Sequence, residues 1–252
     1  MPKVYSTMSS ILLEVAVFTL EGALEAIRAG AHRLEMCENA HDGGTTPSKS
    51  TLDFIHSVSP IPVFPIIRAR GGDFVYTAEE KKIMLADILY CRNRGFKGVV
   101  SGGLLRDGRI DNDFLLRCID AAGPMEFTFH RAFDRCVDPL NAMEQIIGAG
   151  AKRILSSGQY PALPDGIPLL KKMVEQAGNR LIVLPGSGLT RHTVKQVVEK
   201  TGVKEVHTSA RKLISNTTTF QPDTFPEQMA YTGVDAEEIQ VILSLLASCS
   251  SK

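Results

Sequence analysis

Short runs of β-branched and other apolar residues alternate along the chain with segments of helical periodicity. Each run has the length of one strand, and each is followed by a segment whose apolar residues fall on one helical face. Strands that alternate with helices in this way are typical of βαβ units and a parallel sheet. The eight predicted strands span 12–18, 33–38, 63–68, 98–102, 126–130, 153–158, 181–185 and 205–209.

The number of strand–helix units favours a closed barrel over an open sheet. Eight right-handed crossovers in 252 residues fit a (β/α)8 TIM barrel, an α/β fold. A doubly wound open sheet usually needs only five or six strands. No linker divides the chain, so we expect a single domain over residues 1–252. Within it, residues 1–10 are expected to be a flexible N-terminus, and 213–233 a long loop over the barrel mouth.

Alternation within the strands indicates which side chains point into the barrel. Outward residues meet the helices and must be apolar, while inward ones alternate with them. A barrel interior built only for stability is filled with Val, Ile and Leu. Here the predicted inward set is polar: Glu14, Glu35, Cys37, Arg68, Thr128, His130, Ser157, His207 and Ser209. Burying such groups without partners is unfavourable, so the pattern predicts a ligand site at the C-terminal mouth.

Five acidic or imidazole residues are the candidates for catalysis. Glu35 and His130 could serve as acid and base, with pKa values moved by neighbours and burial. Asp134 could orient or pair with His130 as the chain turns into the next helix. Glu14 lies beside Glu35 on the adjacent strand, so the two carboxylates could share a proton or a cation. His207 lies one layer deeper than His130.

Each of these candidates also has a structural interpretation, which stays open. Glu35 and Arg68 sit on neighbouring strands and could simply form a buried ion pair. Glu14 could accept hydrogen bonds from the backbone, and His130 and His207 could be satisfied core residues.

The loops after the strands supply candidate anion ligands. A glycine turn at Gly186-Ser187-Gly188 leads into a helix expected near Thr190, a place where barrels often bind phosphate. Arginines after the third strand suit a carboxylate or phosphate. A tight turn without a ligand, and a rim salt bridge from Asp73 to Arg70, are the alternatives. The predicted ligand-binding residues are Arg68, Arg70, Asp73, Ser157, Gly186, Ser187, Gly188 and Ser209.

Composition excludes several classes of partner and reaction. Lys and Arg total 28, as do Asp and Glu, and no basic stripe is interleaved with aromatics, so nucleic acid is not expected. The apolar runs are strand-sized, so no membrane partner is expected. Five scattered cysteines without a CxxC pair predict a reducing cytoplasm. No lysine ends a predicted strand, which disfavours a Schiff-base aldolase.

Several long motifs resemble the CutC family of copper-homeostasis proteins. The resemblance covers residues 11–211 and implies a cytoplasmic TIM barrel, dimeric or higher, linked to copper tolerance or copper binding. The matching motifs are LEMC at 34–37, GGTTPS at 43–48, PIIRARGGDF at 65–74, TFHRAFD at 128–134, SSG at 156–158, PGSG at 185–188 and VHTSA at 206–210.

The copper role implied by the resemblance rests on cysteines near the ends of the first two strands. Cys37 matches the second cysteine, whereas Ala16 stands at the position of the first. Copper(I) prefers two or more soft ligands, and Met36 faces the other way. What the resemblance implies is a metal site at Cys37, with copper as the cofactor and with help from His130 or His207.

Two functions follow from the sequence. The first is a copper-homeostasis barrel that binds copper through Cys37. The second is an enzyme of lyase, isomerase or hydrolase type that acts on a small anionic or phosphorylated metabolite. In the second case Glu14, Glu35 and His130 could instead hold a hard divalent cation such as manganese or zinc.

Overall fold

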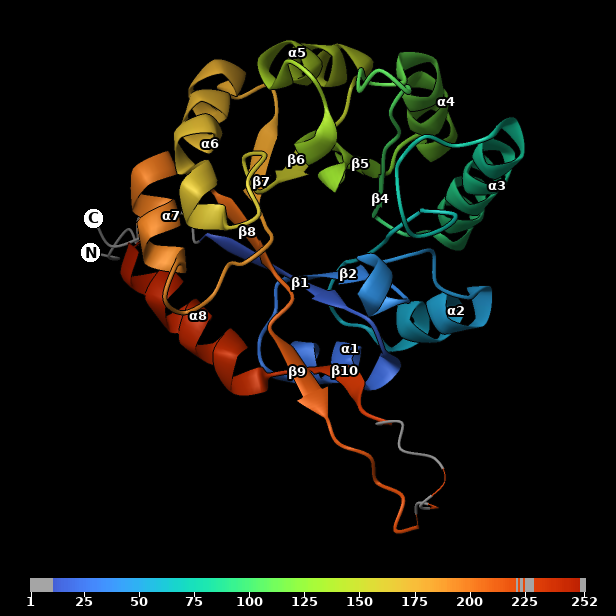
Figure 1. Ribbon diagram of the computed structural model, residues 1–252, viewed down its shortest axis with the longest axis vertical. Coiled ribbons are helices and arrows are strands. Elements are labelled where there is room, and N and C mark those ends of the chain that lie inside the picture. The colour runs from blue at the N-terminus through green and yellow to red at the C-terminus, as the bar shows by residue number, and fades with distance from the viewer. Residues whose placement is uncertain (1–10, 221, 223, 225–228, 250–252) are drawn as a thin grey trace, which may run out of the picture.

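The computed structural model describes residues 11–220, 222, 224 and 229–249. The expected flexible segment 1–10 lies outside these described residues. Strands and helices alternate along the chain, and the helices surround the strands (Figure 1). The strands of the barrel are β1 (Leu12–Val17), β2 (Arg33–Met36), β3 (Val63–Pro65), β4 (Gly98–Ser101), β5 (Glu126–Phe129), β6 (Arg153–Ser156), β7 (Ile182–Pro185) and β8 (Glu205–Thr208).

Parallel pairing places the strands in barrel order. The hydrogen-bonded order is β3-β2-β1-β8 in one four-stranded sheet and β4-β5-β6-β7 in the other. A parallel bridge between Ile66 and Val100 joins β3 to β4, and β7 contacts β8 on the other side. This order, with helices around it, confirms the predicted (β/α)8 TIM-barrel fold.

The strands are shorter than predicted because their polar ends leave the ladder early. β2 ends at Met36 and β3 at Pro65, so Arg68 belongs to the loop after β3. His130 likewise follows β5 and caps the 3-10 turn η2 (Arg131–Arg135). The residues predicted at the strand ends are therefore at the mouth, but on loops.

Caps and glycines set the ends of the helices. Thr77 and Glu80 form a capping box at the start of α3, which ends at Gly95 with φ +86°. The turn 191–193 delays α7, so it begins at Val194 rather than near Thr190. Among the described residues no helix is long and apolar enough to cross a bilayer. The helices are α1 (Leu20–Arg28), α2 (Lys49–Val58), α3 (Ala78–Arg94), α4 (Asn112–Ala122), α5 (Pro139–Ala149), α6 (Leu163–Ala177), α7 (Val194–Thr201) and α8 (Ala236–Cys249), with η1 (Ala40–Asp42) and η2 as 3-10 turns.

Outward side chains of the strands form the core together with the helices. Leu13, Val15 and Val17 on β1 are fully buried in the main hydrophobic cluster, as the alternation predicts. The same alternation turns Glu14 and Ala16 into the barrel interior, where both are buried. The polar interior thus lies inside an apolar shell.

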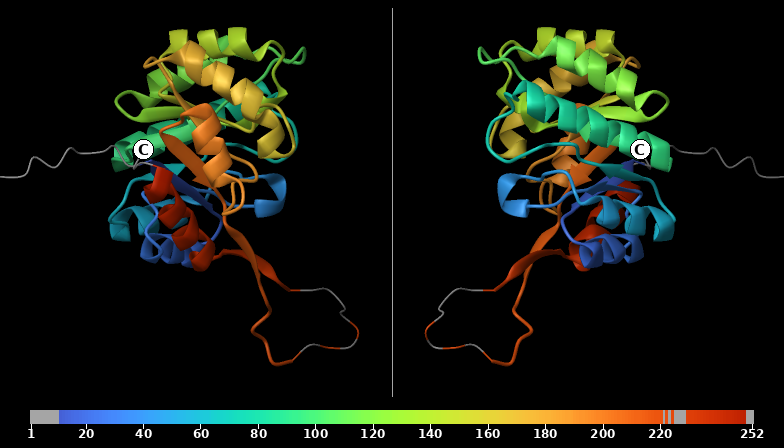
Figure 2. Two further views of the ribbon diagram at one scale, coloured as in Figure 1. Left: turned by 90° about the vertical axis from the view of Figure 1, so that its left-hand side faces the viewer. Right: turned by 90° about the vertical axis from the view of Figure 1, so that its right-hand side faces the viewer.

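The connection 213–233 differs from the expected loop over the mouth. It starts in β9 (Arg211–Ile214) and returns in β10 (Tyr231–Val234), and these two strands pair antiparallel. The described part of this hairpin projects outward from the barrel (Figures 1 and 2). Strand pairing extends the backbone away from the rim, so the described part of the connection leaves the mouth open.

Candidate functional site

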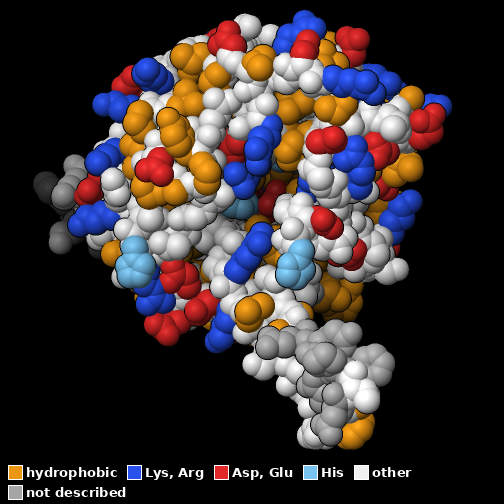
Figure 3. Space-filling view, in the orientation of Figure 1, with side chains coloured by type: hydrophobic (Ala, Val, Ile, Leu, Met, Phe, Trp, Pro, Cys, Tyr) orange, Lys and Arg blue, Asp and Glu red, His pale blue; other side chains and the backbone are white. Residues whose placement is uncertain are grey.

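A cavity of about 940 Å³ opens at the carboxyl ends of the strands. Loops after β2, β3, β4, β5, β7 and β8 form its walls, which is the position of ligand sites in barrels of this kind. On this face, Lys and Arg side chains flank a central hollow (Figure 3). The charged and imidazole residues of the lining are Glu35, His41, Asp42, Arg68, Asp73, Arg106, His130, Arg131, Arg135, His207 and Arg211.

The cavity brings together part of the predicted site. The predicted residues that line it are Glu35, Arg68, Asp73, His130, Ser187, Gly188, His207 and Ser209. Those that lie outside the lining are Glu14, Cys37, Arg70, Asp134, Ser157 and Gly186.

Below the cavity, a network of ion pairs crosses the barrel interior. Strand register places Glu14 between Arg33 on β2 and His207 on β8, and its carboxylate contacts both side chains. Arg33 contacts Glu205 at 2.6 Å, and Glu205 contacts Arg153 at 3.1 Å. Each buried charge therefore meets an opposite charge, which offsets the cost of removing it from water.

His207 connects this network to the cavity. Its Nδ1 lies 2.7 Å from Glu14 Oε1, and its Nε2 lies 3.8 Å from Glu35 Oε2. Burial works to raise the pKa of Glu14, but Arg33 and His207 outweigh it and hold that pKa at about 2. Because an ionised carboxylate can only accept, His207 Nδ1 donates to Glu14 and leaves Nε2 facing Glu35. Glu14 thus pairs with Arg33 and His207 instead of sharing a proton with Glu35, as its register neighbours dictate.

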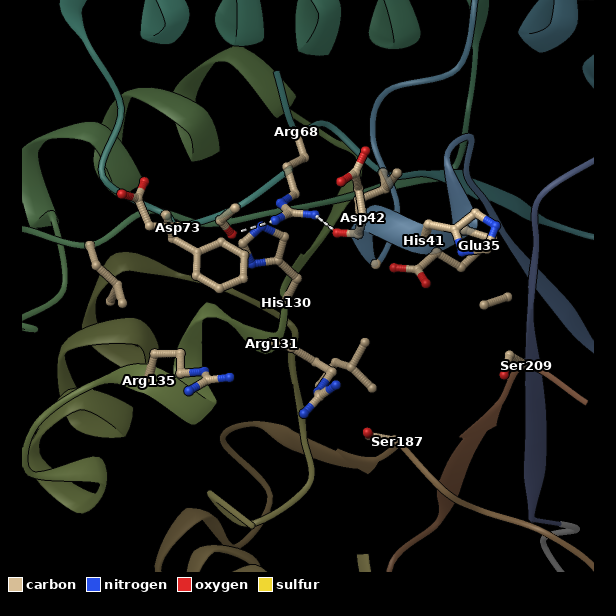
Figure 4. Close-up of a pocket in the computed structure, with 18 of the residues that line it drawn as sticks. Glu35, His41, Asp42, Arg68, Asp73, His130, Arg131, Arg135, Ser187 and Ser209 are labelled. Atoms are coloured by element: carbon tan, nitrogen blue, oxygen red, sulfur yellow. Dashed lines mark hydrogen bonds between the residues drawn. The ribbon is translucent and has the colours of Figure 1, made fainter. Parts of the chain in front are cut away.

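Glu35 can exchange a proton with a ligand in the cavity. Its side chain is buried yet lines the cavity, and Figure 4 shows the carboxylate directed into it. Burial raises the pKa of Glu35 to about 7, against the charge of His207 and with that of Glu14. Burial also works to lower the pKa of His207, but the hydrogen bond with Glu14 and the charge of Glu35 raise it. The pair can therefore hold or release a proton near neutral pH, as general acid–base catalysis requires.

Arg68 binds backbone carbonyl groups and not Glu35. Its guanidinium donates to the carbonyl oxygens of Asp42, Gly44 and Gly72, and it stacks over the Phe74 ring at 4.9 Å (Figure 4). Its buried Nε has no hydrogen-bond partner among the described residues. Carbonyl oxygens fix the guanidinium without cancelling its charge, so Arg68 presents a positive charge to the cavity. The buried Glu35–Arg68 ion pair considered from the sequence does not form.

His130 is a neutral hydrogen-bond donor. Its Nδ1 accepts a hydrogen bond from the Ala132 N–H at 3.3 Å, so the ring hydrogen is on Nε2. That Nε2 is buried and has no partner among the described residues. Burial lowers the pKa of His130 to about 3, and the charge of Arg68 adds to the effect. This favours a donor role near neutral pH over the base role proposed from the sequence.

Asp134 supports the loops beside His130 and does not orient its ring. Its carboxylate accepts hydrogen bonds from Ser156 Oγ at 2.6 Å and from the Ser157 N–H at 3.0 Å, and it pairs with Arg131 at 2.8 Å. Ser157 Oγ donates to a backbone carbonyl. Asp134 and Ser157 thus join the loops after β5 and β6 and fix Arg131 at the rim, which differs from the catalytic and ligand roles expected for them.

The turn after β7 and the end of β8 leave backbone N–H groups free. The Gly186 N–H continues the sheet by donating to a β6 carbonyl at 3.0 Å. In the described part of the chain, the N–H groups of Ser187, Gly188 and Ser209 donate to no protein acceptor. Ser187 and Gly188 adopt left-handed φ values of 73° and 97°. Free N–H groups of this kind form anion-binding concavities.

Arg70 forms the rim salt bridge that was the alternative to ligand binding. Its guanidinium lies 3.0 Å from Asp73 Oδ1 and 2.7 Å from Glu80 Oε1. Its donors are thus already bound within the loop after β3. The loop holds Phe74, on which the Arg68 guanidinium and the His130 ring both pack.

Three further arginines at the rim have no carboxylate partner. Arg106, Arg135 and Arg211 line the cavity, and none forms an ion pair with a described carboxylate. The Arg211 guanidinium lies 4.7 Å over the Phe18 ring. Arg106 lies in a loop, Arg135 ends η2 and Arg211 begins β9, so their position after a strand of the barrel is the only sequence signal that could have found them. Together with Arg68 they create a positive potential that favours an anion.

The sequence prediction also missed Arg33 and Glu205, the ion-pair partners inside the barrel, although the strand alternation places both on the inward face. Arg33 stands two positions before Glu35, and Glu205 two before His207, so both share the inward face with a predicted residue. Extending the inward set to the first residue of each strand would have found them.

The residues around Cys37 do not fit copper(I). The thiol is buried among apolar side chains that include Phe64 and Ile66, and it lies 3.8 Å from the Glu35 carbonyl oxygen. Burial raises the pKa of the Cys37 thiol well above its usual value, which disfavours the thiolate that binds the metal. Ala16 supplies no second sulfur. The predicted soft-metal site is therefore incomplete.

The alternative site for a hard cation does not assemble either. Among the described residues, no group of three or more His, Cys, Asp or Glu side chains is arranged to hold a metal ion. Glu14 faces Arg33 and His207, while His130 lies beside Arg68, so Glu14, Glu35 and His130 share no common ligand position.

Comparisons with known proteins agree on one family. The model of the CutC family matches residues 11–212. The human copper homeostasis protein cutC homolog is 41% identical over 81% of this chain and 74% of its own length. A CutC family protein of Parabacteroides distasonis is 39% identical over 91% of this chain and 95% of its own.

Solved structures give the same assignment. A structure described as a copper homeostasis protein CutC from Streptococcus agalactiae has a TM-score of 0.75 and 31% identity, and covers 79% of this chain and 98% of that one. Phosphoribosyl anthranilate isomerase from Thermotoga maritima, at 14% identity and a TM-score of 0.58 over 94% of this chain and 99% of that one, shares the fold alone. From the extent of the family match and the identity to its members, the chain belongs to the CutC family.

Proposed function

We propose that this chain is an enzyme that uses Glu35 as an acid–base group on a small anionic metabolite. The observation that carries the proposal is the chain of contacts from Glu14 through His207 to Glu35, which ends in a cavity lined by arginines. Glu14 holds His207 by one ring nitrogen, and the other nitrogen faces Glu35. This arrangement keeps a transferable proton at the cavity wall.

The positive rim selects the charge of the substrate. The cavity is lined by Arg68, Arg106, Arg135 and Arg211, none of which pairs with a carboxylate in the part of the chain that the structure describes. A bound anion would therefore gain attraction that these residues do not already spend on an ion pair. The cavity volume of about 940 Å³ is in the range of small-molecule sites. A small anionic metabolite therefore fits both the charge and the size.

Incubation of the protein with a cell-free metabolite extract, followed by mass spectrometry, tests this function. We expect the wild type to deplete one or more anionic metabolites, and Glu35→Gln to slow that depletion by roughly 100-fold or more. Glu175→Gln, on the exposed face of α6, is the matched control and should match the wild type. Equal depletion by wild type and Glu35→Gln would contradict the proposal.

Copper binding is the second candidate, and family membership favours it, since relatives are named copper homeostasis proteins. The buried thiol of Cys37 and the alanine at position 16 argue against a thiolate site in this chain. We therefore expect copper(I) titration to give equal affinities for the wild type and Cys37→Ala. A clear loss of affinity in Cys37→Ala would restore Cys37 as a ligand. A cytoplasmic location and a homo-oligomeric state remain predictions.

A further inference from the structure

The cavity presents chemically different groups on opposite walls. Figure 4 shows Arg68 and His130 on one side, Ser187 and Ser209 on the other, and the Glu35 carboxylate on the wall between them. All five residues line the same cavity. A single bound molecule would therefore meet two donor groups, one base and one anion-binding turn.

The first wall contains two buried donors that have no acceptor. Arg68 Nε and His130 Nε2 are both buried without a hydrogen-bond partner among the described residues. Arg68 is fixed by carbonyl oxygens and His130 by the Ala132 N–H, so neither group is free to turn away. Unsatisfied buried donors call for an explanation, and a ligand oxygen that gains negative charge during reaction supplies one.

The opposite wall suits a tetrahedral anion. The free N–H groups of Ser187, Gly188 and Ser209 are joined there by two side-chain hydroxyls, and Arg211 lies at the same rim. A phosphate monoester has three terminal oxygens and can accept from several of these donors at once, whereas a carboxylate has two oxygens. The number of donors therefore favours a phosphate group over a carboxylate at this wall.

From this arrangement we propose that the site enolises a phosphorylated hydroxy-carbonyl compound. The phosphate binds between Ser187 and Ser209, and the carbonyl oxygen binds at Arg68 and His130. The C–H group next to the carbonyl then lies over Glu35. The inference rests on the proposed function and names its substrate class. Glu35 removes the proton from the carbon next to the carbonyl group. The C–H electron pair becomes a C=C bond, and the carbonyl π electrons move to oxygen as an enolate. Return of the proton to the same carbon re-forms the carbonyl group and completes the exchange. Return to the former carbonyl carbon, with transfer of the hydroxyl proton of the enediolate to the enolate oxygen, gives the isomeric carbonyl compound. Neither route consumes an oxidant or reductant.

The neutral form of His130 suits this step. A neutral imidazole can donate a hydrogen bond from its Nε2–H to the enolate oxygen. The fixed positive charge of Arg68 stabilises the same oxygen. His207 and Glu14 act as positioning residues, since Glu14 holds His207 and His207 faces the Glu35 carboxylate.

Hydrogen–deuterium exchange at carbon tests the inference without knowledge of the product. The probes are dihydroxyacetone phosphate, ribulose 5-phosphate and fructose 6-phosphate in D₂O, followed by proton NMR. We expect the wild type to exchange the C–H next to the carbonyl of at least one probe. Glu35→Gln should slow the exchange by roughly 100-fold or more, and His130→Ala by roughly 10- to 1,000-fold. Glu175→Gln should match the wild type.

Two further measurements keep the test independent of folding defects. The pH profile of exchange by the wild type should rise to a plateau with a midpoint near the Glu35 pKa of about 7, because the base form is the active one. Unphosphorylated dihydroxyacetone should exchange at least 10-fold more slowly than its phosphate.

Absence of exchange with all three phosphorylated probes overturns the inference, as does equal exchange by Glu35→Gln. Depletion of a different anion from the metabolite extract would then leave the proposed function standing while rejecting enolisation. Failure of both experiments would reject the two together.

Discussion

The barrel interior has two layers that treat charge in opposite ways. In the inner layer, made of Glu14, Arg33, Arg153, Glu205 and His207, every described charge contacts an opposite one. In the mouth layer, made of Arg68, Arg106, Arg135 and Arg211, none of the four arginines pairs with a carboxylate of the described residues. Charges that are paired hold the fold together, and charges that are left unpaired in a cavity are available to a ligand.

Glu35 lies at the boundary between the layers. The inner layer fixes the ionised Glu14, Glu14 fixes His207, and His207 faces Glu35 at the cavity wall. A change in the inner layer should therefore appear as lost stability. A change in the mouth layer should leave stability nearly intact and appear in binding.

The largest expected effect is on the inner layer. Arg33→Met removes the cation between Glu14 and Glu205 and leaves two buried carboxylates without it, which should cost about 3–5 kcal/mol of unfolding free energy. Urea denaturation at pH 7 measures this. Arg180→Gln breaks an exposed pair with Glu144 and serves as the control, with little change in the unfolding midpoint. A similarly small change for Arg33→Met would show that the inner layer does not stabilise the fold.

A smaller change in unfolding free energy, in the stabilising direction, is expected for Glu35→Gln. The pKa of Glu35 is raised in the folded state to about 7 from an ordinary 4.5, so the folded protein binds this proton more tightly than the unfolded chain. Stability associated with Glu35 is therefore present below about pH 4.5 and is lost as the pH rises towards 7. The glutamine in Glu35→Gln does not ionise, so the variant does not lose this stability as the pH rises. It should be more stable than the wild type at pH 8, by roughly 1–3 kcal/mol.

Thermal unfolding at pH 5 and at pH 8 measures this difference. The advantage of Glu35→Gln should shrink towards the lower pH, because the wild-type carboxyl is protonated there. His207, Glu14, Cys37 and Arg33 all act on the Glu35 carboxyl and are unchanged in the variant. A variant less stable than the wild type at pH 8 would mean that Glu35 is ionised and well paired in the folded protein.

The smallest expected effect is on the stability of the mouth layer. The double variant Arg135→Gln/Arg211→Gln removes two positive charges without breaking an ion pair. Its unfolding free energy in an anion-free buffer should stay within about 0.5 kcal/mol of the wild type, as for other surface changes. Urea denaturation provides the comparison with Arg33→Met. A loss as large as that of Arg33→Met would remove the distinction between the two layers.

The inner face of the barrel was predictable from the sequence because strand side chains alternate. That rule placed Glu14, Glu35 and His207 inside the barrel, and all three are buried there. It did not identify which residues meet, because contacts across the barrel depend on the register between strands. The register places Arg33 and His207 beside Glu14, so Glu14 pairs with them and not with Glu35.

The mouth was less predictable because loops have no periodicity. An ion pair between Arg68 and Glu35 was one of the alternatives left open, but the loops after β2 and β3 surround Arg68 with carbonyl oxygens. Asp134 was expected to contact His130, but its carboxylate instead accepts hydrogen bonds from the Ser156 hydroxyl and the Ser157 N–H. Arg135 and Arg211 follow strands without any pattern that marks them as cavity residues.

Calorimetric titration with inorganic phosphate tests most directly whether the unpaired arginines serve a ligand. At low ionic strength the wild type should bind one phosphate per chain with a saturable isotherm. The affinity should fall by roughly 10-fold in Arg135→Gln/Arg211→Gln, which corresponds to about 1.4 kcal/mol, and should weaken further with added salt. Equal affinity in both proteins, or no saturable binding to the wild type, would contradict an anion site at the mouth of this barrel.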